Sequence, residues 1–491
     1  LLTYLVLKII YRLTLHPLAG FPGPKLAAVT SLYNAYYDIM QPGLIKKLPE
    51  MHKKYGDVIR VQPGQLHVAS LEGYNQIFRV GTPFARVWHH NPFLTGSLQS
   101  LTTLAETKKR RVFLSPFFSK ASIIRAEPFL HRQKLTLFLD TLQASAGDVV
   151  DFFLGFRCLT ADTIMDYCFQ QDLNALAEPG FQSETVDAFI AGFDLALVGT
   201  YFPNFFAVLN KIIFALPESV RETYFKPVYG FQTMQKVCLA EERVDYLIAN
   251  PNSSNTKLTS MFDAMLSPDT AKSQVTPSKH DMVADGCLMI AAGTDTTANV
   301  LGLVLWHVSQ NPEVEAKLLT ELKAAMPERE CLLGSEKLEG EEFVYMRAVV
   351  KEGLRLAYGV PGSIMRKVPR EGATIGGRFV PGGTIVSSGI YLQNTDPSTF
   401  PDPHRFDPSR WLCDPETYAQ RDRQMLSFSR GSRGCIGINL AYTTLHLTVA
   451  HLFRRFEIST SGYTTEWDMD WRDRFVPAAN GRIKGLVKVR E

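Results

Sequence analysis

The sequence lacks a marked excess of charge of either sign. Its 491 residues carry 52 Lys and Arg against 49 Asp and Glu, which leaves a formal net charge of +3. The only compact basic run covers residues 108–111, and short isolated runs of this kind are commonly solvated helix faces. The charge balance therefore gives no support for a nucleic-acid partner.

Regularly spaced cysteines are also missing. The seven cysteines are odd in number and widely separated, and no two have the spacing of a zinc site or a redox CxxC motif. This usage argues against a disulfide framework and indicates a reducing compartment.

A long apolar run at the start of the chain is the third absence. Residues 1–10 are largely apolar and are followed by Tyr11 and Arg12, but a bilayer span needs about 20 apolar residues. The sequence begins at Leu1, and we expect residues 1–15 to be the end of a truncated N-terminal membrane anchor. A buried N-terminal helix is the alternative.

Prolines mark the segment after the expected anchor. Pro17, Pro22, Gly23 and Pro24 form a stiff break, so residues 16–30 are predicted to be a proline-rich hinge. Beyond it, 45% hydrophobic and 11% aromatic residues are ample for a large core with an apolar pocket.

A cysteine-containing loop is the most informative feature that is present. Residues 428–437 combine one cysteine with three glycines and two arginines. Ile436, Leu440 and Leu447 then recur on one helix face, which predicts a helix beginning close to Cys435. The dipole and free N–H groups of such a helix favour a thiolate, as a haem iron ligand requires. A lone cysteine is also commonly a small buried apolar side chain.

A second segment carries residues that helix propensity does not explain. Helical character persists from Lys279 to about Gln310, after a plausible N-cap at Ser278, and residues 292–297 interrupt it with Gly and Thr. The threonines either bond back to carbonyls one turn earlier or take part in proton transfer. Beyond Arg366 the pattern changes to short strands and turns, so we predict a mainly α fold with minor β.

The cysteine loop resembles the haem-binding loop of the cytochrome P-450 family of haem-thiolate monooxygenases. The resemblance is carried by Phe428, Gly431, Arg433, Cys435 and Gly437. It implies that Cys435 is the axial ligand of the haem iron, that Arg433 pairs with a propionate and that Phe428 packs beside the sulfur. It also implies the family's fold, with haem between a long distal helix and the proximal cysteine loop. One catalytic domain over residues 31–491 is then expected.

The long predicted helix is similar to the family's distal helix at Ala292-Gly293-Thr294-Asp295-Thr296-Thr297. The resemblance makes Asp295 and Thr296 the acid–alcohol pair that handles protons during oxygen activation. Gly293 is expected to leave room against the haem.

Other matches are structural or concern the propionates. Glu352 and Arg355 are three residues apart on one helix face, and the family pairs them with an arginine that corresponds to Arg405. The resemblance assigns this cluster to the scaffold. Arg366 and Arg111 are the further candidates for propionate contacts.

One position departs from the family pattern. Related proteins usually carry Trp or His four residues before Arg111, and this chain has Thr107. One haem contact is therefore weakened or replaced. Lys108 and Lys109 either belong to a docking surface for an acidic electron donor or are solvated.

The resemblance implies a monooxygenase that inserts one oxygen atom of O₂ into an apolar substrate. Electrons are expected from NADPH through a separate reductase, and the anchored protein is expected at the endoplasmic reticulum membrane with its catalytic domain on the cytosolic face. The hinge and Tyr358-Gly359-Val360-Pro361-Gly362 look like fungal secondary-metabolism members similar to trichodiene oxygenases, which favours a terpenoid or polyketide substrate. The alternatives are a reductase-independent isomerase, dehydratase or peroxygenase, and a non-catalytic haem-binding protein.

Overall fold

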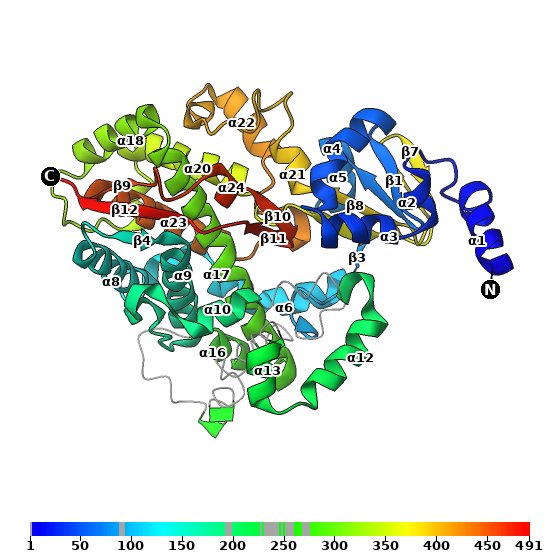
Figure 1. Cartoon of the computed structure of the whole chain (residues 1–491), viewed down its shortest axis with the longest axis horizontal. Helices are drawn as coiled ribbons and strands as arrows, with labels where there is room; N and C mark the ends of the chain where they lie inside the picture. The colour runs from blue at the N-terminus through cyan, green and yellow to red at the C-terminus, as the bar shows by residue number, and fades with distance from the viewer. Residues whose placement is uncertain are drawn as a thin grey trace.

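One long helix, α17 (Lys279–Ser309), runs through the middle of the computed structural model (Figure 1). The Ser278 hydroxyl accepts a hydrogen bond from the Asp281 N–H at its start. At its far end, Asn311 caps the following helix, which begins at Pro312. Both ends agree with the sequence prediction. The 31 residues of α17 span about 46 Å, enough to cross the helical part of the molecule.

The structure describes residues 2–87, 94–191, 199–225, 228–229, 245–246, 249–250, 260–267 and 275–491. The chain is 58% helical, with 11% strand in small sheets. This confirms the predicted mainly α fold with minor β.

Longer helices surround α17. They are α6 (Leu104–Phe117), α8 (His131–Ala144), α9 (Phe152–Phe169), α18 (Pro312–Ala325), α20 (Val344–Ala357) and α23 (Ile438–Arg455). Of these, α9, α18, α20 and α23 pack directly on α17. One apolar core contains side chains from α8, α9, α17, α18, α20 and α23. Burial of this apolar surface stabilises the helical part at roughly 25 cal/mol per Å².

Shorter helices complete the described helical structure. They are α2 (Lys25–Val29), α3 (Leu32–Ala35), α4 (Leu44–Tyr55), α5 (Leu71–Phe78), α7 (Lys120–Ala126), α10 (Glu184–Ala191), α12 (Pro203–Phe214), α13 (Glu218–Tyr224), α16 (Met261–Leu266), α19 (Ser335–Leu338), α21 (Ile390–Asn394), α22 (Pro415–Gln424) and α24 (Glu466–Met469). Five residues, Tyr36–Met40, form a π-helical turn after α3.

The largest sheet lies at the end of the molecule that carries the N-terminal segment (Figure 1). Its strand order is β1-β2-β8-β5-β3, with only β2 and β8 parallel. The strands are β1 (Val58–Gln62), β2 (Gln65–Val68), β3 (Ala85–Arg86), β5 (Ser363–Lys367) and β8 (Ile385–Gly389). The sheet thus joins two parts of the chain that are about 300 residues apart.

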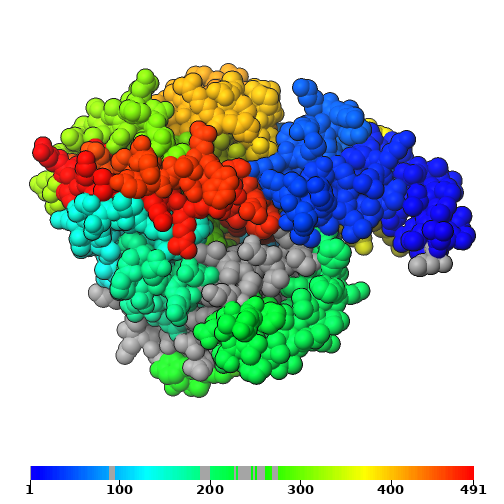
Figure 2. All heavy atoms as spheres, viewed as in Figure 1, coloured from blue at the N-terminus to red at the C-terminus, as the bar shows by residue number. Residues whose placement is uncertain are grey.

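Three smaller sheets use later segments. Their strands are β4 (Val149–Asp151), β12 (Lys484–Val489) and β9 (Phe456–Ser459), the hairpin β10 (Trp471–Arg474) with β11 (Val476–Ala479), and the hairpin β6 (Ala373–Ile375) with β7 (Arg378–Val380). In the space-filling view the C-terminal segment, in red, lies between the N-terminal part, in blue, and the helices in cyan (Figure 2).

Helix α1 (Leu2–Thr14) lies at one end of the molecule (Figure 1) and has no buried residue. The hinge behind it is held against β1, since the Arg60 N–H donates to the Pro22 carbonyl at 2.7 Å. The Arg60 guanidinium also donates to the Arg12 and Leu18 carbonyls. A Cβ on Gly23 would lie 2.3 Å from the Arg60 carbonyl oxygen, so only glycine permits this approach.

Among the described residues, α17 alone is long and apolar enough to pass as a membrane span. Most of its apolar stretch is buried among the helices that surround it, as in the core helix of a soluble domain. Its apolar character is therefore explained by packing. The divisions at residues 15 and 30 remain predictions.

Candidate active site

The Cys435 loop lies directly before α23, whose N-cap is Gly437. The Cys435 N–H donates to the Phe428 carbonyl at 2.9 Å, which closes the loop. Gly431 has φ +77°, and a Cβ there would lie 1.8 Å from the carbonyl oxygen of Phe78. Only glycine fits that position, and the predicted helix after the cysteine is confirmed.

Cys435 keeps accessible surface inside a densely packed part of the protein. Its side chain has accessible surface, although protein atoms surround it as densely as a fully buried group. These two observations agree if the accessible surface faces inward. A Cβ added to Gly437 would meet no atom within 4 Å, so the backbone leaves room beside the sulfur.

Opposing effects act on the Cys435 thiol. Burial, the larger effect, raises its pKa, while the Gly437 backbone N–H and the Arg111 charge lower it. The protein alone thus does not supply the thiolate expected from the helix N-terminus. Coordination to a metal ion would deprotonate the thiol, since the thiolate is the ligand.

The middle of α17 exposes one narrow face. Ala292 is exposed, and Thr296 and Asn299 are half-buried, whereas Thr294 and Asp295 are buried. Ala292, Thr296 and Asn299 follow helical spacing and so share a face. The Thr296 hydroxyl donates to the Ala292 carbonyl at 2.7 Å.

The Cys435 loop and α17 meet in one apolar cluster. Ile436 and Leu440 belong to it together with Leu288 and Ala291 of α17. The segment that follows Cys435 therefore packs into the same apolar cluster as part of α17.

Gly293 and Asp295 face another helix. A Cβ on Gly293 would lie 2.8 Å from Ile164 Cγ1 on α9. The missing side chain of Gly293 makes room for α9, and Ala292 is the most exposed residue of this segment, so the expectation that Gly293 leaves room against the haem stays a prediction. The Asp295 carboxylate is ion-paired to Arg157 of α9 at 2.7 Å, so Asp295 and Thr296 lie on different faces of α17.

Three arginines near the cysteine loop, Arg86, Arg366 and Arg433, have no acidic partner among the described ion pairs, although the charge of Glu106 acts on Arg433. Arg86 and Arg366 are directly opposite each other in the β3–β5 pairing. Burial, together with the charges of Arg366 and Arg433, lowers the pKa of Arg86 to about 9, and burial with the charge of Arg433 lowers that of Arg366 to about 10.

The hydrogen bonds of these arginines all go to backbone carbonyl oxygens. The acceptors are those of Gln99, Met365, Leu101, Thr102 and Thr103. Like charges opposed in a sheet and buried cations without counter-ions are both unfavourable. The arrangement fits a ligand with carboxylates, and the two propionates of haem meet that requirement.

A sequence model of the cytochrome P-450 family matches residues 24–482. This chain belongs to the cytochrome P-450 family. Among its relatives are the cytochrome P-450 monooxygenases macH of Penicillium terrestre and astB of Aspergillus terreus, each 33% identical. The matches cover 99% and 98% of this chain and 96% and 94% of those proteins. N-acetyltryptophan 6-hydroxylase ivoC of Emericella nidulans is 31% identical over 98% of this chain and 96% of its own length.

The family assignment makes the protein a haem-thiolate oxidoreductase of the monooxygenase class. Cytochromes P-450 of this class generally use a redox partner and lipophilic substrates. The accessible Cys435 fits a haem iron ligand. Arg86, Arg366 and Arg433, which have no carboxylate partner among the described ion pairs, fit the haem propionates.

The departure from the family pattern at Thr107 has a structural explanation. Thr107 is buried, and its hydroxyl donates to the Thr103 carbonyl at 2.8 Å, so it offers no group to a cofactor. Arg111 donates to the Gly434 carbonyl of the cysteine loop at 3.0 Å. Sequence reasoning missed Arg86, because only the pairing of β3 with β5 brings it beside Arg366.

The predicted scaffold around Glu352 is correct in part. Arg355 donates to both carboxylate oxygens of Glu352, at 2.7 and 2.9 Å, and both side chains are fully buried. The second arginine is Arg410, whose Nε lies 3.3 Å from Glu352 Oε1. The assignment of the Arg405 side chain is wrong: Arg405 is exposed, and its backbone carbonyl accepts from Arg355.

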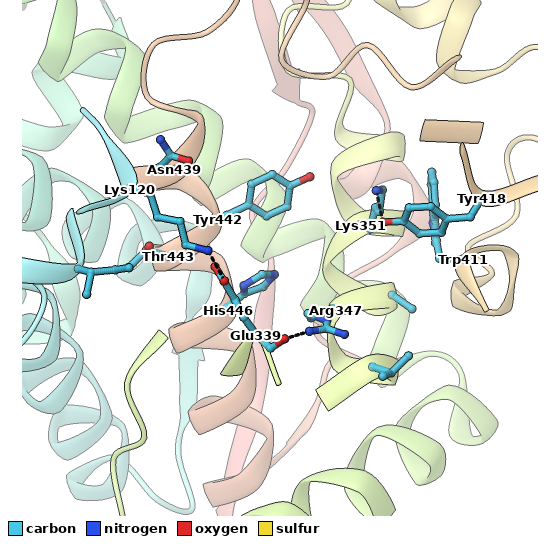
Figure 3. Close-up of a pocket in the computed structure, with 13 residues that line it drawn as sticks. Lys120, Glu339, Arg347, Lys351, Trp411, Tyr418, Asn439, Tyr442, Thr443 and His446 are labelled. Atoms are coloured by element: carbon cyan, nitrogen blue, oxygen red, sulfur yellow. Dashed lines mark hydrogen bonds and ion pairs between the residues drawn. The ribbon is translucent and has the colours of Figure 1, made fainter. Parts of the chain in front are cut away.

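A groove of about 470 Å³ lies on the α23 side of the site (Figure 3). Its lining includes Lys120 of α7, Arg347 and Lys351 of α20, and Tyr442 of α23. The Tyr442 ring packs on Phe428 of the cysteine loop, with 5.3 Å between ring centroids. This groove, in which Lys120 is paired with Glu339 and Lys351 with Asp422, lies one aromatic layer behind the cysteine loop.

Proposed function

We propose that Cys435 is the axial ligand of the haem iron. We further propose that Arg86, Arg366 and Arg433 bind the haem propionates, with Arg111 supporting the loop carbonyl beside the sulfur. The observation that carries this proposal is the accessible Cys435 sulfur beside Gly437, together with arginines that have no carboxylate partner among the described ion pairs. Bound haem with a thiolate ligand supplies the redox chemistry that activates dioxygen.

The residues of α17 have separate roles in this proposal. Thr296 presents its hydroxyl at the open face and passes a hydrogen bond to the reacting oxygen. Asp295 supplies protons from the α9 side. Positioned proton transfer of this kind commonly accelerates a reaction by roughly 10²- to 10⁴-fold. Thr296→Ala is expected to divert electrons to peroxide, and fully coupled turnover in that variant would refute the relay.

The proposed substrate is an apolar terpenoid or polyketide of fungal secondary metabolism. The support is the family's use of lipophilic substrates and the fungal relatives described above. One relative is named for hydroxylating N-acetyltryptophan, so aromatic substrates also occur among similar enzymes. Untargeted product analysis after co-expression with a reductase and the neighbouring genes tests this choice. A charged, water-soluble product skeleton would rule it out.

Electrons are proposed to come from NADPH through a separate reductase. Lys108 and Lys109 are exposed on α6, which also carries Arg111, and Lys120 and Lys351 line the groove behind the cysteine loop. An acidic donor surface complements these cations. The double variant Lys108→Glu, Lys109→Glu is expected to lower the rate at which the reductase reduces the haem. It should also make that rate less dependent on salt concentration. Equal rates in the variant would place the donor elsewhere.

We also propose attachment to the endoplasmic reticulum membrane, with the catalytic domain (31–491) on its cytosolic face. Helix α1 exposes Leu5, Ile9 and further apolar side chains, and α12 exposes a stripe through Phe205 and Ile212. Apolar surface of this kind is stabilised in a membrane interface. Ile9→Lys with Phe205→Lys should shift the chain from the microsomal pellet to the supernatant, whereas retention in the pellet would contradict this assignment.

The central test uses Cys435→Ser and, as a matched control, Cys413→Ser. The reduced carbon-monoxide complex of the parent protein and of the control should show the red-shifted Soret band of a thiolate ligand. Cys435→Ser should lose it, and an unchanged band would remove the ligand assignment. Turnover without reductase and NADPH would indicate an isomerase, dehydratase or peroxygenase. Ligand-induced spectral change with no product would indicate a non-catalytic haem protein.

A further inference from the structure

Helices α20 and α23 each turn one face toward the groove of Figure 3. Within each helix the lining residues are spaced i, i+3, i+4 and i+7, so they form a continuous row. The rows are Val344, Arg347, Ala348 and Lys351 on α20, and Asn439, Tyr442, Thr443 and His446 on α23. The groove volume of about 470 Å³ lies within the roughly 300–1,000 Å³ of small-molecule sites. The groove is therefore large enough for a ligand of one or two rings.

The α23 row offers polar groups that the protein leaves unpaired. Thr443 and His446 are 8% and 7% exposed, and Tyr442 is half-buried. None of these three side chains has a hydrogen-bond partner among the described residues, yet their polar atoms keep accessible surface in the groove. Burial, followed by the charges of Arg347 and Lys120, lowers the pKa of His446 to about 4, so its ring is neutral at pH 7. A ligand that accepts hydrogen bonds would satisfy these groups.

The lysines at the groove are already paired. Lys120 forms an ion pair with Glu339, and Lys351 Nζ lies 2.6 Å from both the Asp422 carboxylate and the Tyr418 hydroxyl. Figure 3 shows the Lys120 and Lys351 contacts on opposite sides of the groove. Glu339 is the only acidic residue among the described lining residues. No lining carboxylate is therefore left without a cation.

Arg347 is the cation that remains for a ligand. Its guanidinium donates to the backbone carbonyl of Glu339, and no described ion pair includes it. Its charge acts on Glu321 and Glu342 from beyond ion-pair distance. Arg347 and His446 belong to the two rows that line the groove, and the charge of Arg347 acts on the His446 ring. A guanidinium binds a carboxylate through two parallel hydrogen bonds, which a neutral ligand does not form.

We propose that this groove is a second ligand site that binds a small aryl carboxylate, with the carboxylate on Arg347 and the ring between the two rows. Trp411 and Tyr442 supply aromatic surface, on which an aryl group packs in an offset or edge-on arrangement. The unpaired groups of Thr443 and His446 belong to side chains that are more than nine-tenths buried. A flat protein surface does not reach such groups, so a small molecule is the better occupant. The site is separate from the haem site and does not rest on the function proposed above.

The experiment titrates 2-naphthoate into the haem-loaded protein and records the heat of binding and the Soret band together. A probe beside the haem iron shifts the Soret band, whereas the rings of Tyr442 and Phe428 separate the groove from the cysteine loop. The neutral analogue 2-naphthamide has the same ring system without the charge. The protein variants are Arg347→Gln and His446→Phe, with Arg423→Gln as the matched control. Arg423 is exposed on α22 and does not line the groove.

The parent protein should bind 2-naphthoate with no shift of the Soret band, and 2-naphthamide at least about 10-fold more weakly. Arg347→Gln should weaken binding of 2-naphthoate by at least about 10-fold, because it removes a charge-assisted pair of hydrogen bonds. His446→Phe keeps a ring of similar shape and should weaken binding by about 2- to 10-fold. Arg423→Gln should bind as the parent does. Equal melting temperatures of the variants and the parent show that folding is not the cause.

Four outcomes would overturn the proposal. They are the absence of saturable binding at 1 mM 2-naphthoate, equal affinities of Arg347→Gln and Arg423→Gln, equal affinities of the acid and the amide, and binding that shifts the Soret band. If 2-naphthoate does not bind but Arg347→Gln alone slows haem reduction by the reductase, the groove is a protein contact and not a small-molecule site.

Discussion

At the scale of single residues, the placement of Arg86 says most about the cofactor. Arg86 and Arg366 oppose each other across two antiparallel strands, and Arg433 adds a third charge close by. Burial, followed by the charges of Arg366 and Arg433, lowers the pKa of Arg86, and the described ion pairs include no carboxylate for any of the three. In the apoprotein this cluster is destabilising, and an anionic ligand removes the repulsion.

Arg86→Leu should therefore weaken haem binding by about 10- to 150-fold. A charge-assisted hydrogen bond contributes roughly 1.5–3 kcal/mol, and each 1.4 kcal/mol is a factor of ten. The apoprotein should lose no stability, because one of the opposed charges is gone. Haem transfer to an excess of apo-globin measures the first effect, and urea unfolding of the haem-free chain measures the second.

Arg423→Leu is the matched control, because Arg423 is exposed on α22 and its loss changes the net charge equally. It should leave the haem transfer rate unchanged. A transfer rate for Arg86→Leu equal to that of this control would contradict the assignment of Arg86 to a propionate.

At the scale of elements, the contact between α9 and α17 decides how the residues of the 292–297 segment are used. Gly293 and Asp295 turn toward α9, which also donates a hydrogen bond to the Thr294 carbonyl, and Ala292 and Thr296 turn toward the open face. Two consecutive residues of a helix point about 100° apart, so a single motif serves two faces. The close approach at Gly293 sets the distance between the two helices.

Gly293→Ala should lower the free energy of unfolding by about 1–3 kcal/mol, the usual cost of overpacking. The added Cβ would lie 2.8 Å from Ile164 Cγ1 and 2.9 Å from Cδ1. Urea denaturation of both proteins measures the difference. Ile164→Ala should cost less in the Gly293→Ala background than alone, with a coupling of roughly 0.5–3 kcal/mol.

Gly302→Ala on the same helix provides the control. Its added Cβ would meet only Ile483 Cγ2, at an ordinary contact distance of 3.7 Å. Replacing a helix-interior glycine by alanine there should stabilise the chain by up to about 1 kcal/mol. Equal effects of the two substitutions would show that helix propensity, and not the contact with α9, dominates at Gly293.

At the scale of the whole molecule, buried histidines and buried aspartates give opposite contributions to acid stability. Burial lowers the pKa of four of the described histidines to about 4, namely His131, His307, His446 and His451. Burial raises the pKa of Asp162 and Asp285 to about 6. Unfolding takes up protons on the histidines below pH 6.5 and releases them from these aspartates, so the two groups partly cancel.

His131→Phe should remove one histidine contribution. Because the folded pKa of His131, about 4, lies below the unfolded value of 6.5, its contribution to stability is complete at high pH. It is lost as the pH falls below 6.5. The substitution should stabilise the chain by about 2 kcal/mol more at pH 5 than at pH 7.5.

A phenylalanine side chain is also compatible with the surroundings of residue 131. The His131 ring is buried and lies 6.0 Å from the Tyr167 ring, and neither of its nitrogens has a hydrogen-bond partner in the described part of the chain. Urea unfolding at both pH values gives the difference, with His280→Gln at an exposed position as control. If the free energy of unfolding changed with pH in the same way for His131→Phe and the parent, His131 would titrate alike in the folded and unfolded states.

The amino-acid sequence alone establishes the mainly α fold, both ends of α17, the helix after Cys435 and the family. The fold and the helix ends follow from local periodicity and capping residues. The family follows from the highly specific residue pattern of the cysteine loop. The folded structure is needed to show that Gly293 faces α9, that Arg410 and not the Arg405 side chain reaches Glu352, and that Arg86 joins Arg366 and Arg433. The physical reason is that helix phase and strand pairing determine which side chains meet, and those partners lie up to about 300 residues apart in the chain.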